Sequence, residues 1–328
     1  MREKSRSLRK WLLQVQDVLI SATLGAVENT DYSNLYILNQ YAGVKFGTPI
    51  LGRLQHGWSP DELSSMYYQN NYVQSFVWSQ KAEDCAHGKG WRNVHAIGAP
   101  WLYLTAILKK DGWNSCPEES IESRSLEEIW VYGFHSTKRV ESVDTELVEF
   151  IELAIKSKAT RKQVLLSESD FRCIQAHSSE IFKEIDIVTL GKRRGNISSN
   201  SHLFRLYHLL SNTQTIVTDH PTTLLLYGIT LGCRLSWIYN SSFDKGYEFA
   251  LKNNDLELKY FMNNSLNDME LKKFAYDCLG QSSFKTPDEI RKLFLWHSDR
   301  ILFSLKIFTI LKNTFSLIPR YVRSKIWS

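Results

Sequence analysis

Short apolar runs alternate with polar stretches of helical periodicity from about residue 47 onward. This alternation predicts a parallel α/β architecture, because each buried strand is followed by a helix that returns the chain to the start of the next strand. Two sets of strands are expected. The first set consists of Pro49–Gln55, Tyr72–Trp78 and Val94–Ile97. The second set consists of Ile129–Phe134, Gln163–Ser167, Ile185–Leu190, Thr215–Thr218 and Arg234–Ile238.

Helices are predicted between these strands and after the last of them. In the first part of the chain they cover residues 11–27, 33–43, 80–87 and 100–109. Among the second set of strands they cover residues 144–157, 200–211 and 221–231. Beyond about residue 240 no further strand is expected, and the helical stretches are 246–253, 267–279, 287–298 and 300–318.

These changes of pattern predict four segments. Residues 1–110 form one Rossmann-like domain and residues 125–240 form a second. Residues 111–124 are the expected linker, because they are polar, contain Gly112 and Pro117, and show no periodicity. Residues 241–328 are expected to form a helical extension that ends in a basic amphipathic tail.

The composition supports a globular chain with substantial cores. Of the 328 residues, 43% are hydrophobic and 12% are aromatic, which excludes a disordered or fibrous protein. The 5 cysteines are odd in number and contain no C-x-x-C pair. They therefore exclude a disulfide scaffold or a zinc ribbon, and they fit the reducing cytosol.

The net charge of +5 is concentrated at the two ends of the chain. Residues 1–10 carry an excess of basic side chains, residues 300–328 carry basic side chains and no acid, and the body between them is mildly acidic. Nucleic-acid binders usually spread positive charge over a folded face, so this distribution argues against a nucleic-acid partner. It favours contact with a surface of anionic lipid.

Neither end is predicted to cross a membrane. Asp17 interrupts the first apolar stretch, and Lys306 and Lys312 interrupt the last one, which leaves uncharged runs too short for ~30 Å of hydrocarbon. We instead expect a cytoplasmic protein that attaches peripherally to the inner face of the cytoplasmic membrane through its basic termini. The alternative is that the last helix only packs on the body.

The segment Leu51–Trp58 is the first motif with chemical potential. Its apolar run ends in His56, Gly57 and Trp58, and ligands of open α/β sheets bind beyond the carboxyl ends of strands. His56 could serve as a base, Gly57 allows close approach of the backbone, and Trp58 offers a flat face for a sugar or base. The alternative is a histidine that caps a helix over a buried tryptophan.

The segment Thr218–Thr223 is the second motif. It follows an apolar run and opens a helix, with Pro221 suited to the first helical position and Asp219 or His220 suited to capping. Free amides, hydroxyls and the helix dipole at such a position favour a phosphate. The residues expected to bind it are Asp219, His220, Pro221, Thr222 and Thr223. The alternative is a well-capped helix without a ligand.

Other loops fall at corresponding strand ends. Two of them offer donors for a phosphate or carboxylate, and these donors are His135, Ser136, Thr137, Gly191, Lys192 and Arg193. A solvated turn is the alternative for the basic pair. Four further residues are expected to line a cleft without chemical roles, namely Trp78, Ser79, Gly98 and Pro100.

Several signatures are absent from the sequence. It contains no D-x-D, no G-x-x-x-x-G-K-[ST], no G-x-G-x-x-G, no G-x-S-x-G and no H-E-x-x-H. We therefore expect no metal site and no cofactor. An enzyme of this kind would stabilise a leaving group with amides, hydroxyls and basic side chains.

Taken together, these segments resemble GT-B-type glycosyltransferases of bacterial surface-polysaccharide synthesis, which covers capsule, O-antigen and lipopolysaccharide. The order of I-L-G-R-L-Q-H-G-W, F-V-W-S, I-G-A-P-W-L-Y, F-H-S-T and residues 216–233 carries the resemblance. The last segment looks like the T-[DN]-x-x-[ST]-x-x-x-x-Y-x-x-x-x-G pattern of Kdo and sialic-acid transferases and CDP-glycerol glycerophosphotransferases. The paired acidic D/E-D/E-G motif of sialyltransferases is missing.

The resemblance implies a GT-B-like α/β fold, with two Rossmann-like domains facing a central cleft and with C-terminal helices. Residues 1–110 would be the acceptor domain and residues 125–240 the nucleotide-sugar donor domain. His135 and His220 would be donor-side groups, and His56, Gly57 and Trp58 would lie on the acceptor side.

The implied activity is metal-independent glycosyl transfer. The donor is expected to be a nucleotide-sugar, with a CMP-linked ulosonic acid such as Kdo or a nonulosonate as the leading expectation. The acceptor is expected to be a growing surface glycan, free or lipid-linked. The base remains open among His56, Asp31, Asp61 and Glu83.

Two other functions remain open. The first is a CDP-polyol phosphotransferase on the same fold. The second is a non-catalytic assembly partner that docks on the membrane through its basic helices.

Overall fold

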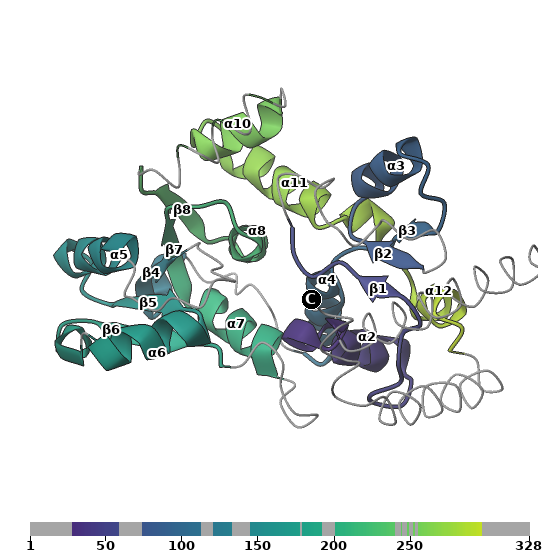
Figure 1. Ribbon diagram of the computed structural model, residues 1–328, viewed down its shortest axis with the longest axis horizontal. Helices are drawn as coiled ribbons and strands as arrows, with labels where there is room; N and C mark the ends of the chain where they lie inside the picture. Colours follow the sequence, from purple (N-terminus) through teal and green to yellow (C-terminus); the bar gives the residue numbers. More distant parts are fainter. Residues whose placement is uncertain are drawn as a thin grey trace, which may run out of the picture. The chain divides into compact units, whose positions relative to one another are not determined.

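The computed structural model describes residues 28–58, 74–112, 121–132, 145–177, 179–191, 201–239 and 255–296, together with positions 244, 248 and 252. It is an α/β structure with one three-stranded and one five-stranded parallel sheet (Figure 1). The predicted fold class, α/β with Rossmann-like parallel sheets, is confirmed. The helices predicted at 11–27 and 300–318, and most of 246–253, lie outside the described residues.

The chain divides into two compact units. Of the described residues, unit 1 contains 28–56, 74–103 and 282–296, and unit 2 contains 57–58, 104–239 and 255–281 with the gaps given above. Each unit therefore includes stretches that are distant in the sequence. The helical extension predicted after residue 240 is shared between the two units.

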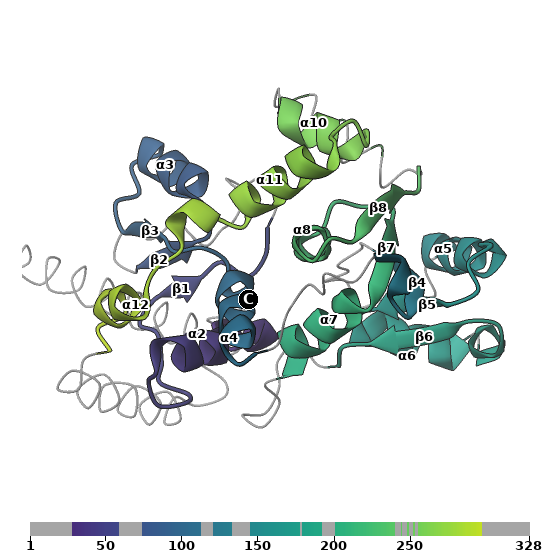
Figure 2. The same cartoon turned by 180° about the vertical axis from the view of Figure 1, so that it is seen from behind.

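Unit 1 is built around the three-stranded sheet, whose strand order is β1-β2-β3. The strands are β1 (Arg53–Leu54), β2 (Ser75–Val77) and β3 (Val94–Ala96). The helical elements that begin in this unit or join it to unit 2 are η1 (Asp31–Ser33), α2 (Asn34–Ala42), α3 (Gln80–Gly88), α4 (Pro100–Lys110), η5 (Gln281–Ser283) and α12 (Pro287–Leu293). Figures 1 and 2 show α3 and α2 on opposite sides of these strands.

The first strand is shorter than the pattern predicts, and a buried side chain satisfies its outer side. Asn29 is fully buried, and its Nδ2 donates to the Gly52 carbonyl at 2.9 Å. Its Oδ1 accepts from Leu54 N at 2.8 Å. Arg53 N and Gln55 N donate to the Gln74 and Phe76 carbonyls, so Asn29 satisfies the side of the strand that faces away from β2, and the strand itself covers only Arg53–Leu54.

Unit 2 is built around the five-stranded sheet, whose strand order is β6-β5-β4-β7-β8. All neighbours are parallel. The strands are β4 (Leu126–Val131), β5 (Lys162–Leu166), β6 (Asp186–Thr189), β7 (Thr213–Thr218) and β8 (Arg234–Trp237). The helical elements are η3 (Ile121–Ser123), α5 (Thr145–Lys156), α6 (Glu168–His177), η4 (Ser179–Lys183), α7 (Ser201–Ser211), α8 (Thr223–Thr230), α10 (Leu256–Met262) and α11 (Asp268–Cys278).

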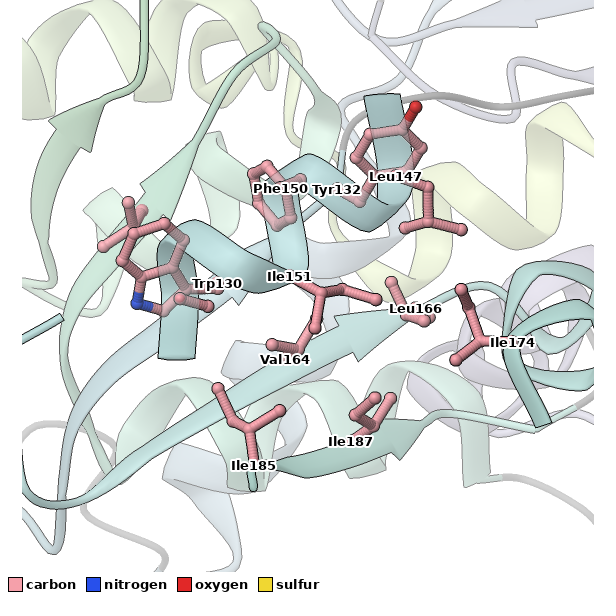
Figure 3. Packing of buried hydrophobic residues seen from close by; sticks show 12 residues of the cluster. Trp130, Tyr132, Leu147, Phe150, Ile151, Val164, Leu166, Ile174, Ile185 and Ile187 are labelled. Atoms are coloured by element: carbon pink, nitrogen blue, oxygen red, sulfur yellow. The ribbon is translucent and has the colours of Figure 1, made fainter. Parts of the chain in front are cut away.

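The core of unit 2 forms on both faces of this sheet. On one face, Phe150 and Ile151 of α5 pack over Val164, and the rings of Phe150 and Trp130 meet edge-on at 5.7 Å (Figure 3). On the other face α8 packs against Ile216 of β7. Figures 1 and 2 show α5 and α8 on opposite sides of the strands. Both faces are buried, which explains why the strands read as continuous apolar runs.

Among the described residues, no helix is long and apolar enough to span a bilayer. The stretches that carry the predicted membrane-binding tails, residues 1–27 and 297–328, lie outside the described part of the chain.

Candidate functional site

The five-stranded sheet has a topological switch point between β4 and β7. From β4 the chain moves outward to β5 and β6, and it then returns to pair β7 with the other side of β4. The loops that leave β4 and β7 therefore run in opposite directions. In open parallel sheets, this divergence creates the crevice where ligands bind. Residues that follow Val131 and Thr218 form the candidate site.

A buried hydroxyl joins the two strand ends at the switch point. Thr218 is fully buried, and its Oγ1 donates to the Val131 carbonyl at 2.9 Å. The same oxygen accepts from His220 N at 3.3 Å. Asp219 is buried beside it, with an exposed fraction of 2%. The turn after β7 is therefore held in a fixed shape at the carboxyl end of the sheet.

The helix that follows this turn begins later than the sequence suggests. Thr222 is the N-cap of α8 and has extended backbone angles, so Pro221 precedes the helix and does not occupy its first position. The side chain of Thr222 makes no cap bond, and a cap by Asp219 or His220 stays a prediction. The Thr218 hydroxyl holds the backbone of this turn upstream of the helix. The first turn of α8 contains no acidic residue.

The segment Gly57–Trp58 lies on the amino end of α8 within unit 2. Trp58 N donates to Thr223 Oγ1 at 2.8 Å. A Cβ on Gly57 would lie 2.9 Å from the same hydroxyl, which explains why glycine is needed here. Thr223 is thus a contact point between this segment and the predicted phosphate-binding turn.

Trp58 itself belongs to an aromatic cluster in unit 2. Its ring meets Phe261 of α10 and Phe274 of α11 edge-on, at 6.4 and 6.2 Å, and its exposed fraction is 8%. The indole therefore packs in the core, and the open flat face expected from the sequence is absent. The alternative of a buried tryptophan describes this residue better.

Of the remaining residues that the sequence predicts for a donor phosphate, the structure describes only Gly191. His135, Ser136, Thr137, Lys192 and Arg193 lie outside the described residues. Gly191 follows β6 with a φ of +78°, and its N–H donates to Thr189 Oγ1 at 3.2 Å.

Arg205 of α7 lies at the same strand end and was missed in the sequence. Its Nη1 donates to the Leu190 carbonyl at 3.3 Å, and the side chain is otherwise exposed. In the sequence Arg205 appears as one more polar position of a helix, and no local pattern links it to residue 191. The carboxyl end of β6 thus carries a guanidinium in addition to the predicted basic pair.

In unit 1, the carboxyl end of β1 brings an imidazole and a carboxylate together. His56 Nε2 lies 3.9 Å from Glu28 Oε2, and the histidine side chain has an exposed fraction of 8%. Asn29 fixes the neighbouring backbone to the strand through Leu54 and Gly52. Glu28 was not singled out in the sequence, because only the fold places it beside His56.

The turn after Glu28 is strained. Tyr32 and Ser33 have φ angles of +56° and +72°, a region that non-glycine residues rarely occupy. Asp31, a base candidate, precedes them and is fully buried. Two adjacent strained residues beside buried polar groups are a feature that clusters at functional sites.

The other candidates of unit 1 have structural contacts. Glu83 Oε2 accepts from Ala96 N at 2.7 Å, which fastens α3 to β3. Ser79 caps α3 through Ala82 N, and Trp78 is buried with an exposed fraction of 1%. Gly98 has a φ of +80° and Pro100 begins α4. Asp61 lies outside the described residues.

The carboxyl ends of β1, β2 and β3 point in the same direction, because the three strands are parallel. His56, Ser79 and Gly98 therefore lie at the carboxyl end of the unit 1 sheet, as the order of strand and loop predicts. Within the described ranges, no group of three or more histidine, cysteine or acidic side chains is arranged to hold a metal ion.

Comparison with known proteins gives limited similarity. No family model matches the sequence, and no curated protein matches it. Two similar solved structures are a UDP-GlcNAc 2-epimerase from Neisseria meningitidis bound to UDP-GlcNAc and the wall teichoic acid polymerase TagF with CDPG. The first shares 11% identity at a TM-score of 0.33, over 70% of this chain and 61% of the epimerase. The second shares 12% identity at a TM-score of 0.30, over 74% of this chain and 57% of the polymerase.

The chain thus spans less than two thirds of the length of either neighbour. Because both TM-scores are low, the description of the fold rests on the two parallel sheets themselves.

Proposed function

We propose that the protein is a glycosyltransferase that uses a nucleotide-linked sugar donor. The observation that carries the proposal is the switch point between β4 and β7, with the turn Thr218–Thr223 beyond it. The turn is held by the Thr218 hydroxyl, the first turn of α8 has no acidic residue, and two threonine hydroxyls stand at its amino end, which favours a donor phosphate there; the acid of the turn, Asp219, is buried beside Thr218.

The turn has a polar atom that is available for a ligand. Thr222 Oγ1 is buried and has no hydrogen-bond partner among the described residues. Buried hydroxyls usually have such a partner, so this atom supports a ligand at the amino end of α8. Lys192 and Arg193 would add positive charge from the neighbouring loop.

The catalytic base that we propose is His56, with the Glu28 carboxylate 3.9 Å from its Nε2. The pair stands at the carboxyl end of β1, and the carboxylate would stabilise the imidazolium that forms. In the reaction the acceptor oxygen bonds to the anomeric carbon of the sugar, and the bond from that carbon to the phosphate oxygen breaks. The acceptor proton passes to His56, and the nucleotide leaves with the bonding electrons.

For the donor we propose a CMP-linked ulosonic acid, and for the acceptor a surface glycan. The support is the pattern formed by Thr218, Asp219, Thr222, Tyr227 and Gly232, which is similar to that of transferases with such donors. Binding of the protein to the inner membrane surface through its basic termini remains part of this proposal.

Thermal shift against CMP, CDP, UDP, GDP and their sugars tests the donor site. We expect one nucleotide to raise the melting temperature of the wild type, because a ligand that binds only the folded state stabilises it. Thr223→Val and His220→Ala should lose most of this shift. Thr230→Val is the matched control, since it removes a hydroxyl at the other end of α8 that bonds to the Tyr227 carbonyl.

The reaction products then distinguish the glycosyltransferase from the phosphotransferase. Release of CMP together with a new glycosidic bond supports the proposal. Transfer of a polyol phosphate would instead identify the phosphotransferase. The absence of a shift with every nucleotide would contradict the enzyme and favour an assembly partner.

A further inference from the structure

A cluster of basic residues with one tryptophan joins α3 to β3 in unit 1. We name residues 87–92 the basic turn. His87, Lys89 and Arg92 are exposed, and Trp91 is half-buried. The segment contains no acidic residue. Figure 1 shows this connection beside α3 and β3.

The backbone of the basic turn has a fixed shape. Lys89 N donates to the Ala86 carbonyl at 3.1 Å, and Trp91 N donates to the same carbonyl at 3.0 Å. Gly90 has a φ of +84°, which permits this tight return after the helix. The basic side chains are therefore presented on an ordered scaffold.

Trp91 lies at the boundary between core and solvent. Its ring packs against the cluster formed by α3 and the strands, which includes Ala86 and Val94. The Lys89 ammonium lies over the ring, 5.6 Å from its centre. An indole at an apolar boundary beside cations is the arrangement that favours the interface of a lipid bilayer.

The two acidic residues of α3 bind other groups. Glu83 accepts from Ala96 N at 2.7 Å, and Asp84 accepts from Gln80 Nε2 at 2.9 Å. Their hydrogen bonds are directed within α3 and toward β3. Both carboxylates keep their charge in these bonds, and Lys81, Lys89 and Arg92 outnumber them, so α3 and the basic turn together keep a small positive excess.

The basic turn lies at the amino end of the strands, and the candidate base lies at their carboxyl end. The turn precedes β3, whereas His56, Ser79 and Gly98 follow the three parallel strands. The two surfaces are therefore distinct. In addition, the described chain enters unit 1 at Glu28 and leaves it at Trp296, so both basic terminal segments are joined covalently to this unit.

We propose that the basic turn is a contact surface for an anionic lipid bilayer. Lys89 and Arg92 would bind headgroup phosphates, and Trp91 would lie at the level of the headgroups. Compensation of the α3 dipole accounts for His87 and Lys89 at the end of the helix, but it does not account for Arg92 and Trp91 beyond it. A nucleic-acid partner is disfavoured by the net acidic body of the chain.

Sedimentation with phosphatidylcholine vesicles, with and without phosphatidylglycerol, tests the proposal on the full chain. We expect binding to the anionic vesicles, and we expect Lys89→Glu with Arg92→Glu to weaken it about tenfold or more. The control reverses two exposed charges on α11 of unit 2, Lys272→Glu with Lys273→Glu, and changes the net charge equally. The control should bind nearly as well as the wild type.

Three results would overturn the proposal. Equal binding by the two double variants would show that only overall charge matters. If Lys89→Glu with Arg92→Glu weakened binding to an oligonucleotide and left vesicle binding unchanged, the basic turn would be assigned to a nucleic acid. If the same variant had a lower melting temperature and bound vesicles like the wild type, the basic turn would have only a structural role at the end of α3.

Discussion

Gly228 marks a close approach of α8 to the unit 2 sheet. A Cβ at this position would lie 2.1 Å from Ile216 Cδ1, a distance that forces one group to move. We expect Gly228→Ala to lower the free energy of unfolding by about 1–3 kcal/mol, because overpacking outweighs the gain in helix propensity. Chemical denaturation measures this change.

Gly88→Ala is the control for that substitution. Gly88 is also helical, and an added Cβ there meets no atom within 4 Å. This variant should be neutral or slightly more stable. A loss of stability as large as that of Gly228→Ala would contradict the packing argument.

His95 gives unit 1 a pH dependence. Burial lowers the pKa of His95 from its usual 6.5, the Glu83 charge raises it, and the charges of His87 and Lys285 lower it further. The folded state therefore binds fewer protons than the unfolded chain, so stability decreases as the pH falls below about 6.5. His95→Gln should flatten the decline in unfolding free energy between about pH 7 and pH 5.

Denaturation at several pH values measures this slope. His208→Gln, at an exposed position of α7, controls for the loss of an imidazole. A wild-type slope in His95→Gln would show that another group is responsible.

The individual residues of the candidate site were only partly predictable. The sequence identified Thr218–Thr223 and His56 because they follow apolar runs. It did not identify the pairing of Glu28 with His56, since the two residues are 28 positions apart and the folded contacts of Asn29 with Gly52 and Leu54 hold their segments side by side. It also suggested an open face for Trp58. The rings that bury Trp58, Phe261 and Phe274, come from helices far along the chain, and no local pattern shows that contact.

At the scale of the elements, Asn29 satisfies the outer side of a strand. We expect Asn29→Ala to lower the stability of unit 1 by about 2–4 kcal/mol, because Gly52 O and Leu54 N lose a buried partner. The variant should also weaken the proposed catalysis, since the Glu28–His56 pair depends on the same contacts. Urea denaturation together with the transfer assay measures both effects.

Asn267→Ala is the matched control at an exposed position. Asn267 caps α11 through Met269 N and Glu270 N, and its removal should cost about 1 kcal/mol without an effect on transfer. Equal losses in both variants would argue against a special role for Asn29.

The order of strands and helices was largely predictable, because parallel strands are continuous apolar runs separated by helices. All the strands in the described residues fall within or beside predicted ranges. The helix α6 was missed because its sequence is mostly polar, with few apolar positions such as Phe171 and Ile174. Charge can mislead in the same way.

Arg124 illustrates this effect of charge. It closes the polar segment predicted as a linker, and it is buried with an exposed fraction of 9%. Its guanidinium donates to the carbonyls of Thr213 and Leu231 at 2.7 and 2.6 Å. An arginine that satisfies backbone carbonyls inside a domain cannot be distinguished by sequence pattern from one in solvent.

At the scale of the whole molecule, residues from the end of the described chain complete unit 1. Trp296 Nε1 donates to the Pro49 carbonyl at 2.9 Å, and Lys285 N donates to Tyr103 Oη at 3.1 Å. Arg291 donates to the Ala42 carbonyl. The sequence pattern did not predict that residues 285–296 contact the first part of the chain. Periodicity indicates whether a segment is a helix or a strand, and it does not indicate which segment it packs against.

This return has a consequence for biosynthesis. Ribosomes deliver residues 282–296 only after every described residue of unit 2, so the part of the protein that is made first is the part that is finished last. Until then the nascent strands β1–β3 lack their closing segment, while the five-stranded sheet already has all of its strands. In newly made chains, apolar residues of unit 1 therefore stay exposed near the N-terminus until residues 282–296 are synthesised, and we expect chaperones to bind there.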